Sequence, residues 1–338
     1  MWHHDLMWHY KMRYMMKQVF LVILLAFGFV AGAQNKIVKK PKKQKPATTQ
    51  VAPKKERASK QREVHSKKQK PATTQVAPEK KGPEVERCPH PKGKVDISPT
   101  IGKANYTPNV KTFYANGVSF EMVEVRGGTF RMGATSEQGS DAYDGEKPVH
   151  SVTLSGYYIG KTEVTQALWK AVMGSNPSEF KGDDLPVERV SWYDCQEFIR
   201  ELNALTGQNF RLPTEAEWEF ACRGGNNSRG YKYSGSNYID NVAWYDGNSE
   251  DKTHPVATKL PNELGLYDMS GNVWEWCSDW NGKYSSGAQT NPKGPYDGSY
   301  RVIRGGSWIF SVGYCRSSRR YNDIPMYRNY CFGLRLAL

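Results

Sequence analysis

Residues 265–280 combine side chains that could bind a cation with residues that favour one rigid conformation. This segment holds three carboxylates, Asp268, Glu275 and Asp279, together with three tryptophans and two glycines. A tryptophan needs a large, shaped pocket, and a glycine loses much backbone entropy on folding. We therefore expect a rigid segment, built around a cation, that supports a functional surface.

Cysteine and histidine content limits the other chemistries. The cysteines are Cys88, Cys195, Cys222, Cys277, Cys315 and Cys331. None lies in a Cys-x-x-Cys pair, so spacing does not indicate zinc, and any disulfide pairing cannot be deduced from the sequence. Residues 98–338 contain two histidines, His150 and His254. An iron site of two histidines and one carboxylate, or a Ser307–His254 hydrolase without a nucleophile elbow, is therefore disfavoured.

The first 33 residues are typical of an export signal with an over-extended start. Lys17 precedes an apolar run at 19–30, and small residues at 31–33 form a cleavage site. The run is shorter than the roughly 20 residues that span a bilayer. We expect an exported protein that begins at Gln34 and is periplasmic, associated with the cell envelope, or secreted. An uncleaved N-terminal anchor is the alternative.

Residues 34–106 have the composition of a disordered basic linker. Residues 34–97 carry 19 Lys and Arg against 6 acidic residues, a surplus equal to the net charge of +13 of the whole chain. The segment 42–53 recurs unchanged as 67–78. Because Lys, Pro, Gln and Thr dominate, these residues cannot bury enough apolar surface to fold.

The charge of the linker indicates the kind of partner it could bind. Its cations could bind anionic envelope polymers or lipid head groups, or it could be a solvated spacer with no specific partner. Residues 98–338 carry 25 basic and 27 acidic residues. The high isoelectric point therefore gives no indication of nucleic-acid binding by the folded part.

Residues 107–338 have the pattern of one domain of mixed α and β structure. Alternating side chains predict strands at 120–125 and 129–133, and a further strand that joins 150–154 with 157–159. After the helices, about 110 residues rich in Gly, Asn, Asp, Tyr and Trp predict long ordered loops.

Capping signals predict three helices between these parts. The first is capped by Thr162 and stopped by Gly174. The second begins with a capping box at Ser191 and Asp194. The third begins with the same device at Thr214 and ends at residues 224–225.

Seven sequence motifs follow one another in a distinctive order across roughly residues 118–338. They are GGTFRMG (127–133), KTEVT (161–165), PVERVSW (186–192), RLPTEAEWE (211–219), GLYDMSGNVWEW (265–276), RGGSW (304–308) and GLR (333–335). This order resembles the formylglycine-generating enzyme, or sulfatase-modifying factor, family. The resemblance implies an α+β fold, C-type-lectin-like, with little regular structure. It also implies bound calcium, and two cysteines that bind copper and oxidise a sulfatase cysteine to formylglycine.

The copper site implied by the resemblance is retained only in part. Ser307 keeps the serine of the Gly-Gly-Ser motif, Phe310 stands at the first copper cysteine, and Cys315 keeps the second. Cu(I) prefers thiolate or thioether ligands, and phenylalanine offers no donor. Ser307 and Cys315 are the candidate catalytic residues, and a plain buried thiol is the alternative for Cys315. Cys331 is too distant in sequence to be expected there.

The resemblance also implies disulfides that this chain lacks. Arg320 stands where a cysteine would pair with Cys222, and Leu336 replaces another. We expect Cys222 to be a buried thiol. The neighbouring arginines could clamp an anion or could form salt bridges to core acids; they are Arg316, Arg319, Arg320 and Arg328.

The family's calcium pattern matches four positions of this chain. It implies ligands from the side chains of Asp268 and Glu275 and from the backbone carbonyls of Gly271 and Val273. Calcium takes six to eight oxygen ligands and mixes carboxylates with carbonyls in tightly turned loops. In the alternative, Asp268 caps the turn and Glu275 pairs with a nearby arginine.

Two functions follow from these residues. In the first, an exported domain without copper oxidase activity is a binding or structural module, tethered by its basic linker, for an unidentified protein or glycan partner. In the second, the chain is a formylglycine-generating oxidase with a modified site, in which Cys315 acts with Ser307. Phe310 beside intact framework motifs favours the first, because fold and function separate readily.

Overall fold

The computed structural model describes residues 107–338. The predicted signal segment, 1–33, and the basic linker, 34–106, lie outside the described residues, so both remain predictions. Within the described part, no helix has the length and apolar composition needed to cross a membrane.

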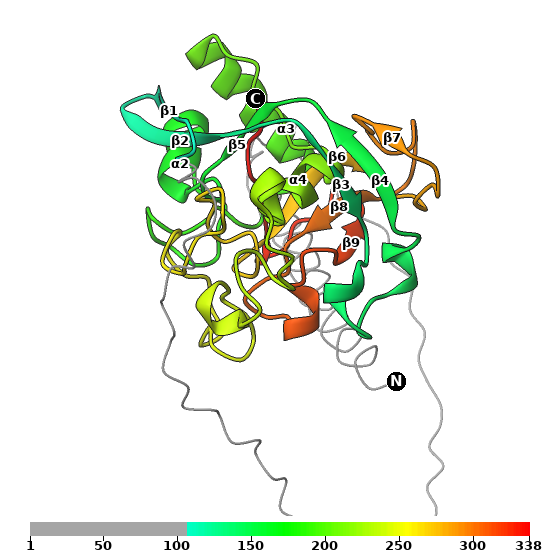
Figure 1. Ribbon diagram of the computed structural model, residues 1–338. Coiled ribbons are helices and arrows are strands. Elements are labelled where there is room, and N and C mark those ends of the chain that lie inside the picture. Colours follow the sequence, from blue (N-terminus) through cyan, green and yellow to red (C-terminus); the bar gives the residue numbers. More distant parts are fainter. Residues whose placement is uncertain (1–106) are drawn as a thin grey trace, which may run out of the picture. The chain divides into compact units, whose positions relative to one another are not determined.

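A β-hairpin opens the described part of the chain. Strands β1 (Val110–Ala115) and β2 (Val118–Val125) pair antiparallel around Asn116 and Gly117. Both turn residues have positive φ, 46° and 84°, which two-residue hairpin turns require and Asn-Gly favours. On its other side β2 pairs antiparallel with β5 (Tyr157–Gly160), so the sheet order is β1-β2-β5 (Figure 1).

A second sheet has the order β3-β4-β7. Strands β3 (Gly128–Met132) and β4 (His150–Leu154) are antiparallel, and the short β7 (Gln289–Thr290) joins β4 in parallel. The prediction that 150–154 and 157–159 form one strand is wrong, because β4 and β5 belong to different sheets. The chain changes sheet at Gly156, which packs beside Gly127. A Cβ on Gly127 would lie 2.6 Å from the carbonyl oxygen of Leu154, so this close approach requires glycine.

A third sheet lies at the centre of the region predicted as long loops. Its order is β10-β6-β8-β9, formed by β6 (Trp274–Trp280), β8 (Arg301–Arg304), β9 (Arg320–Asp323) and β10 (Phe332–Gly333). The first residues of β6 are buried on both faces. A strand buried on both faces lacks alternation, so its sequence does not reveal it.

Three helices pack beside these sheets. They are α2 (Gln166–Met173), α3 (Trp192–Thr206) and α4 (Glu215–Cys222). The capping boxes at Ser191 and Thr214 are confirmed. The cap of α2 is Thr165 rather than Thr162, because the Thr165 side chain accepts a hydrogen bond from the backbone of Leu168.

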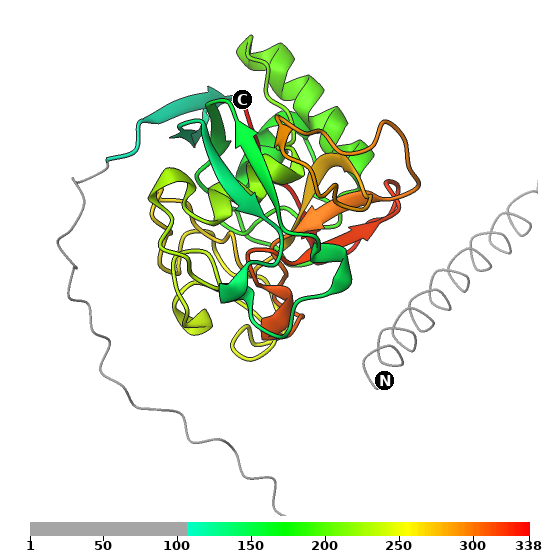
Figure 2. The same ribbon diagram turned by 45° about the vertical axis from the view of Figure 1, so that its right-hand side comes forward.

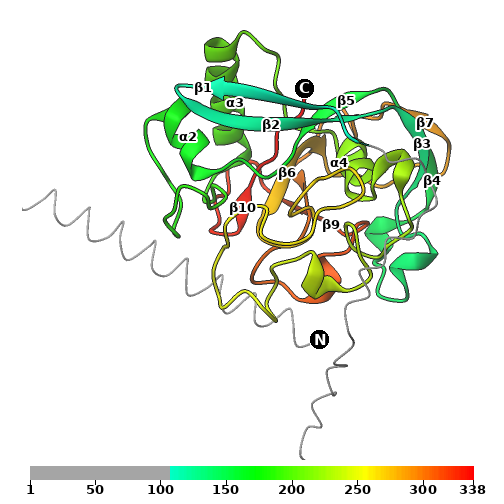
Figure 3. The same cartoon turned by 60° about the vertical axis from the view of Figure 1, so that its left-hand side comes forward.

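Five short 3-10 helices punctuate the loops: η1 (Ser136–Gln138), η2 (Asp144–Glu146), η3 (Gly225–Asn227), η4 (Ile239–Asn241) and η5 (Val312–Tyr314). Between η4 and β6 the chain runs as loops along one side of the domain (Figure 3). The C-terminal Leu338 exchanges backbone hydrogen bonds with Tyr158 on β5, at 3.0 and 2.9 Å.

Two apolar clusters form the core. One joins α2 and α3 to the third sheet and contains Trp169, Phe198 and Trp276. The other surrounds α4 and contains Trp218 and Phe220. Together they make β6 and β8 a rigid base for the segment that follows β8.

Candidate functional site

The segment after β8 carries both candidate catalytic residues. Gly305 and Gly306 have φ of 102° and 78°, in the left-handed region that glycine adopts readily. A Cβ on Gly306 would lie 2.8 Å from Sγ of Cys315, so the turn packs directly on this thiol. The N–H of Gly271 donates to the carbonyl of Gly305 at 2.8 Å. Residues 265–280 thus contact and support this segment.

Ser307 and Cys315 are both fully buried but adjoin different groups. Cys315 lies in an apolar cluster with Tyr233 and Val242, and burial raises its pKa. Ser307 adjoins Cys331. Burial raises the pKa of the Cys331 thiol, and the Ser307 hydroxyl offsets only part of this rise. Because the thiolate is the nucleophile and metal ligand, Cys315 is held in its unreactive form. This environment fits the alternative interpretation of Cys315, a plain buried thiol.

Phe310 occupies the position expected for a copper cysteine and packs as an aromatic side chain. Its ring centroid lies 5.5 Å from that of Trp274, nearly perpendicular to it, and 5.0 Å from that of Tyr314. Trp274 also stacks on Tyr321 at 5.6 Å. We call Phe310, Tyr314 and Tyr321 above Trp274 the aromatic cluster. All three are half-buried, so the cluster borders the surface.

The same stretch of chain exposes further apolar side chains. Val312 is 42% exposed, Ile324 38% and Met326 66%. Sequence analysis did not identify this surface, although the apolar side chains of 309–330, directly after the Gly-Gly-Ser-Trp motif, are a signal for it.

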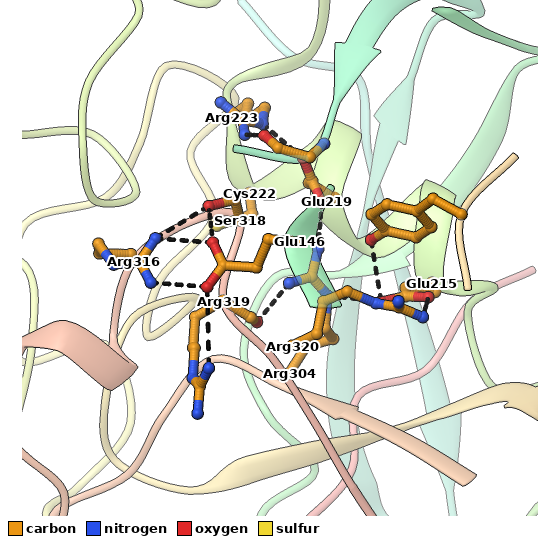
Figure 4. A network of polar contacts seen from close by, with 12 residues as sticks. Glu146, Glu215, Glu219, Cys222, Arg223, Arg304, Arg316, Ser318, Arg319 and Arg320 are labelled. Atoms are coloured by element: carbon orange, nitrogen blue, oxygen red, sulfur yellow. Dashed lines mark hydrogen bonds and ion pairs between the residues drawn. The ribbon is translucent and has the colours of Figure 1, made fainter. Parts of the chain in front are cut away.

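The arginines near the site form salt bridges (Figure 4). Arg316 binds both oxygens of Glu146 at 2.7 Å, and Ser318 donates to the same carboxylate. Arg319 lies 3.8 Å from Glu146. The carboxylate of Glu146 comes from η2, so these contacts fasten the residues after η5 to the N-terminal half of the domain.

A second part of the network lies on α4. Arg320 binds Glu215 in a bidentate pair, at 2.5 and 2.8 Å. Arg304 on β8 pairs with Glu219, which Arg223 also contacts at 2.9 Å. Arg328 pairs with Asp194 at the start of α3. The interpretation as salt-bridge partners of core acids is therefore confirmed for Arg316 and Arg320, whereas the acid that pairs with Arg328 is partly exposed.

All five cysteines of the described residues are free and buried. Cys222 lies 3.7 Å from the carbonyl of Met269, and burial raises its pKa to about 11. Arg320, which replaces its expected partner, points instead to Glu215. The prediction that Cys222 is a buried thiol is confirmed.

Three carboxylates meet beneath the turn at residues 268–273. Burial raises the pKa of Asp268 to about 6. Burial also raises the pKa of Glu163, and the charges of Asp268 and Glu275 add to this effect. Asp268 accepts a hydrogen bond from the N–H of Ala257 at 2.7 Å. Glu275 is paired with Arg335 at 2.7 Å and accepts from Trp218 at 2.6 Å. Sequence analysis did not identify Glu163.

Comparison with known proteins identifies the family. Residues 110–338 match the family described as "Sulfatase-modifying factor enzyme 1-like domain". The chain is similar to the chaperone protein LppX of Paenibacillus barcinonensis, with 38% identity over 245 residues, 58% of this chain and 81% of the relative. It is also similar to the formylglycine-generating enzyme of Streptomyces coelicolor, with 32% identity over 284 residues, 64% of this chain and 88% of that enzyme.

A solved structure, Treponema denticola variable protein 1, superposes with a TM-score of 0.61 and 37% identity, and the match covers 68% of this chain and 99% of that one. The chain belongs to the sulfatase-modifying factor family. Its α+β architecture, with few helices and several small sheets, is the C-type-lectin-like fold of this family.

The residues of this family member do not fit a copper site of two thiolates. Phe310 contributes no donor atom, and burial keeps Cys315 protonated among apolar side chains. Cys331 lies beside Ser307 rather than in the Cys315 cluster.

The calcium positions of the family bring buried negative charge and unpaired carbonyl oxygens into one region, although within residues 107–338 no group of three or more His, Cys, Asp and Glu side chains is arranged to hold a metal ion. Glu163, Asp268 and Glu275 share one paired cation, Arg335. Among the described residues, no hydrogen-bond donor reaches the carbonyls of Gly271 and Val273. The side chain of Glu275 is the exception, because Arg335 and Trp218 occupy both of its oxygens. As a calcium ligand, Glu275 would have to release one of these donors.

Proposed function

We propose that this member of the family is an exported binding module that lacks copper oxidase activity. The observation that carries the proposal is Phe310, which fills the first copper position with an apolar ring packed on Trp274. A protonated, buried Cys315 supplies neither a nucleophile nor a soft ligand. The framework motifs around them keep the fold without the two thiolates that the oxidation needs.

The binding surface of the module is the aromatic cluster, together with the exposed Val312, Ile324 and Met326 of the same stretch of chain. Aromatic rings and exposed apolar side chains that border one another typically mark a contact surface for another molecule. One similar protein is named a chaperone, a class that contacts polypeptides, and this likeness favours a protein partner over a glycan. Calcium at Asp268, Gly271 and Val273 would stabilise the turn beneath, with Glu275 as a further ligand if Arg335 moves.

The predicted export signal and basic linker extend this proposal to the whole chain. The module would act at the cell envelope or outside the cell, with the linker bound to anionic envelope polymers or lipid head groups. The support is the charge surplus of residues 34–97, which is absent from the folded part.

Incubation of the purified chain with copper, oxygen and a peptide containing Cys-x-Pro-x-Arg tests the proposal. We expect the peptide mass to stay unchanged, while an active family member run in parallel converts its cysteine to formylglycine. Formylglycine in the product would establish the alternative, an oxidase with a modified site, and would overturn the binding-module proposal.

A further inference from the structure

A polar cavity of about 500 Å³ opens between the start of α4, the end of β6 and the loop at 282–295. This volume is typical of pockets that bind small molecules, about 300 to 1,000 Å³. The loop carries β7 and lies on the side of the domain where β7 pairs with β4 (Figure 2). None of the residues of the aromatic cluster lines the cavity, so it is separate from the surface described above.

Asp279 offers the cavity a carboxyl group with one oxygen available. It is 4% exposed, and its Oδ2 accepts from the N–H of Glu215 at 3.0 Å and from the Ser278 hydroxyl at 2.9 Å. Within residues 107–338 no donor reaches Oδ1. Burial, with the charge of Glu215, raises the pKa of Asp279 to about 7. Near neutral pH this group can therefore donate a hydrogen bond as well as accept one.

His150 offers a second buried polar atom. Its side chain lines the cavity and is 2% exposed, with Nδ1 at 3.0 Å from the carbonyl of Pro148. A carbonyl only accepts, so Nδ1 carries a hydrogen, and Nε2 is the ring nitrogen left to form a hydrogen bond with a ligand. Asp279 and His150 together match hydroxyl groups, which donate and accept at one atom.

The other charges of the lining favour an anion. Glu215 is neutralised by its bidentate pair with Arg320, so it does not repel a negative ligand. Lys283 and Lys293 line the cavity from the loop, and both are exposed. With Asp279 protonated, the two lysines leave the cavity positive.

The aromatic residues of the lining disfavour a neutral sugar held by stacking. Arg320 lies over the ring of Tyr284 at 4.0 Å, and Arg301 over Trp280 at 3.5 Å. A Cβ on Gly298 would lie 3.1 to 3.4 Å from the Trp280 side chain, so this backbone approaches it as well. Recognition in this cavity therefore depends on hydrogen bonds and charge.

We propose that this cavity binds a sugar acid, with the carboxylate of the ligand at Lys283 and Lys293 and its hydroxyl groups at Asp279 and His150. The proposal adds a small-molecule site to the proposed function and does not depend on it.

Affinity should fall as the pH rises through about 7, because ionised Asp279 adds negative charge inside the cavity. The other charged and titratable groups around Asp279 are Glu215 and Glu217 on α4, Cys277 on β6, Arg301 on β8 and Arg211 before α4. The cavity itself adds His150, Arg320 and the two lysines. Asp279→Asn removes the titrating group but keeps an amide that donates and accepts.

Calorimetric titration of the full chain with D-glucuronate tests the proposal, with D-glucose and succinate as matched probes. We expect glucuronate to bind with a dissociation constant in or below the millimolar range, about −4 kcal/mol or tighter. Glucose lacks the carboxylate and succinate lacks the hydroxyls, so each should bind at least about tenfold more weakly, a difference of about 1.4 kcal/mol.

The double variant Lys283→Gln/Lys293→Gln should weaken glucuronate binding about tenfold or more, while Lys252→Gln, an exposed lysine elsewhere, should not change it. Asp279→Asn should bind glucuronate with a smaller dependence on pH between 6 and 8 than the native chain. No glucuronate binding, equal binding of glucose or of succinate, or an unaffected double variant would each overturn the proposal. If Asp279→Asn does not fold, the lysine double variant and its Lys252→Gln control still test whether the cavity binds a sugar acid.

Discussion

At the scale of single residues, Phe310 stands where the resemblance to the family places the first copper cysteine. Everything around it agrees with an apolar role: Trp274 and Tyr314 pack on its ring, and Cys315 is buried among apolar side chains. The framework motifs build the fold, whereas the copper chemistry that the resemblance implies needs two thiolates, and phenylalanine at position 310 offers no donor atom.

Phe310→Cys should restore a second thiol beside the glycine turn that packs on Cys315. We expect the variant to bind Cu(I) more tightly than the native chain, because two thiolates are the ligand set that Cu(I) prefers. Competition with a coloured Cu(I) chelator measures the affinity. Phe310→Ser, which shortens the side chain without adding a thiol, is the control, and equal affinities of the two variants would contradict the prediction.

Glu188 makes stability depend on pH in a defined direction. Burial raises its pKa to about 8, against an ordinary value of 4.5. The folded chain therefore holds this proton between about pH 4.5 and 8 while the unfolded chain releases it. The contribution of Glu188 to stability is present at low pH and is lost as the pH rises through this window.

Glu188→Gln should remove this loss, because the amide carbonyl can still accept the hydrogen bond that the N–H of Phe180 donates at 2.9 Å. Thermal unfolding should show that the melting temperature of the variant, relative to that of the native chain, is higher at pH 9 than at pH 6. A difference in melting temperature that is equal at both values would show that Glu188 does not titrate in this way.

At the scale of elements, ion pairs between distant segments hold the site in position. Glu146 on η2 fastens the residues after η5 through Arg316, and Glu215 on α4 fastens β9 through Arg320 (Figure 4). Arg320 stands where a disulfide cysteine was expected. In this chain a charged contact to α4 joins the two parts instead.

Glu146→Gln should destabilise the domain by about 3 to 5 kcal/mol, because it leaves the buried guanidinium of Arg316 without its charge partner. Urea denaturation followed by circular dichroism measures the free energy of unfolding. Glu197→Gln breaks an exposed pair with Arg200 on α3 and should cost far less stability than Glu146→Gln, because solvent screens exposed ion pairs. Similar losses in both variants would contradict the assigned role of Glu146.

The turn at residues 268–273 carries the candidate calcium ligands, so removal of calcium should affect the stability of the domain. A chelator should lower the melting temperature of the native chain, because an ion that binds only the folded state stabilises it. Asp268→Asn, which removes one charge of the cluster, should reduce this response. An unchanged melting temperature after chelation, in the native chain and the variant alike, would count against a calcium site.

At the scale of the whole molecule, three small sheets share one domain whose described cysteines are all free. Stability should therefore not depend on redox conditions. Adding a reducing agent should leave the melting temperature of the chain unchanged, as calorimetry with and without the agent would show. A fall in melting temperature would indicate a disulfide that contributes to the fold.

Much of the fold could be predicted where the signal is local. The capping boxes at Ser191 and Thr214 involve residues three positions apart, so sequence alone located the starts of α3 and α4. The cap of α2 was misplaced because Thr162 and Thr165 both fit a helix start, and only the path of the chain selects Thr165.

By itself, the sequence determined the family, because seven motifs stand in a fixed order, and it predicted the supporting role of residues 265–280. Only the tertiary structure decided the rest. It revealed β6, the partners of the arginines, and the cavity at Asp279. The physical reason is distance along the chain: Arg316 and Glu146 are 170 residues apart, and no local pattern encodes which charges become neighbours when the sheets assemble.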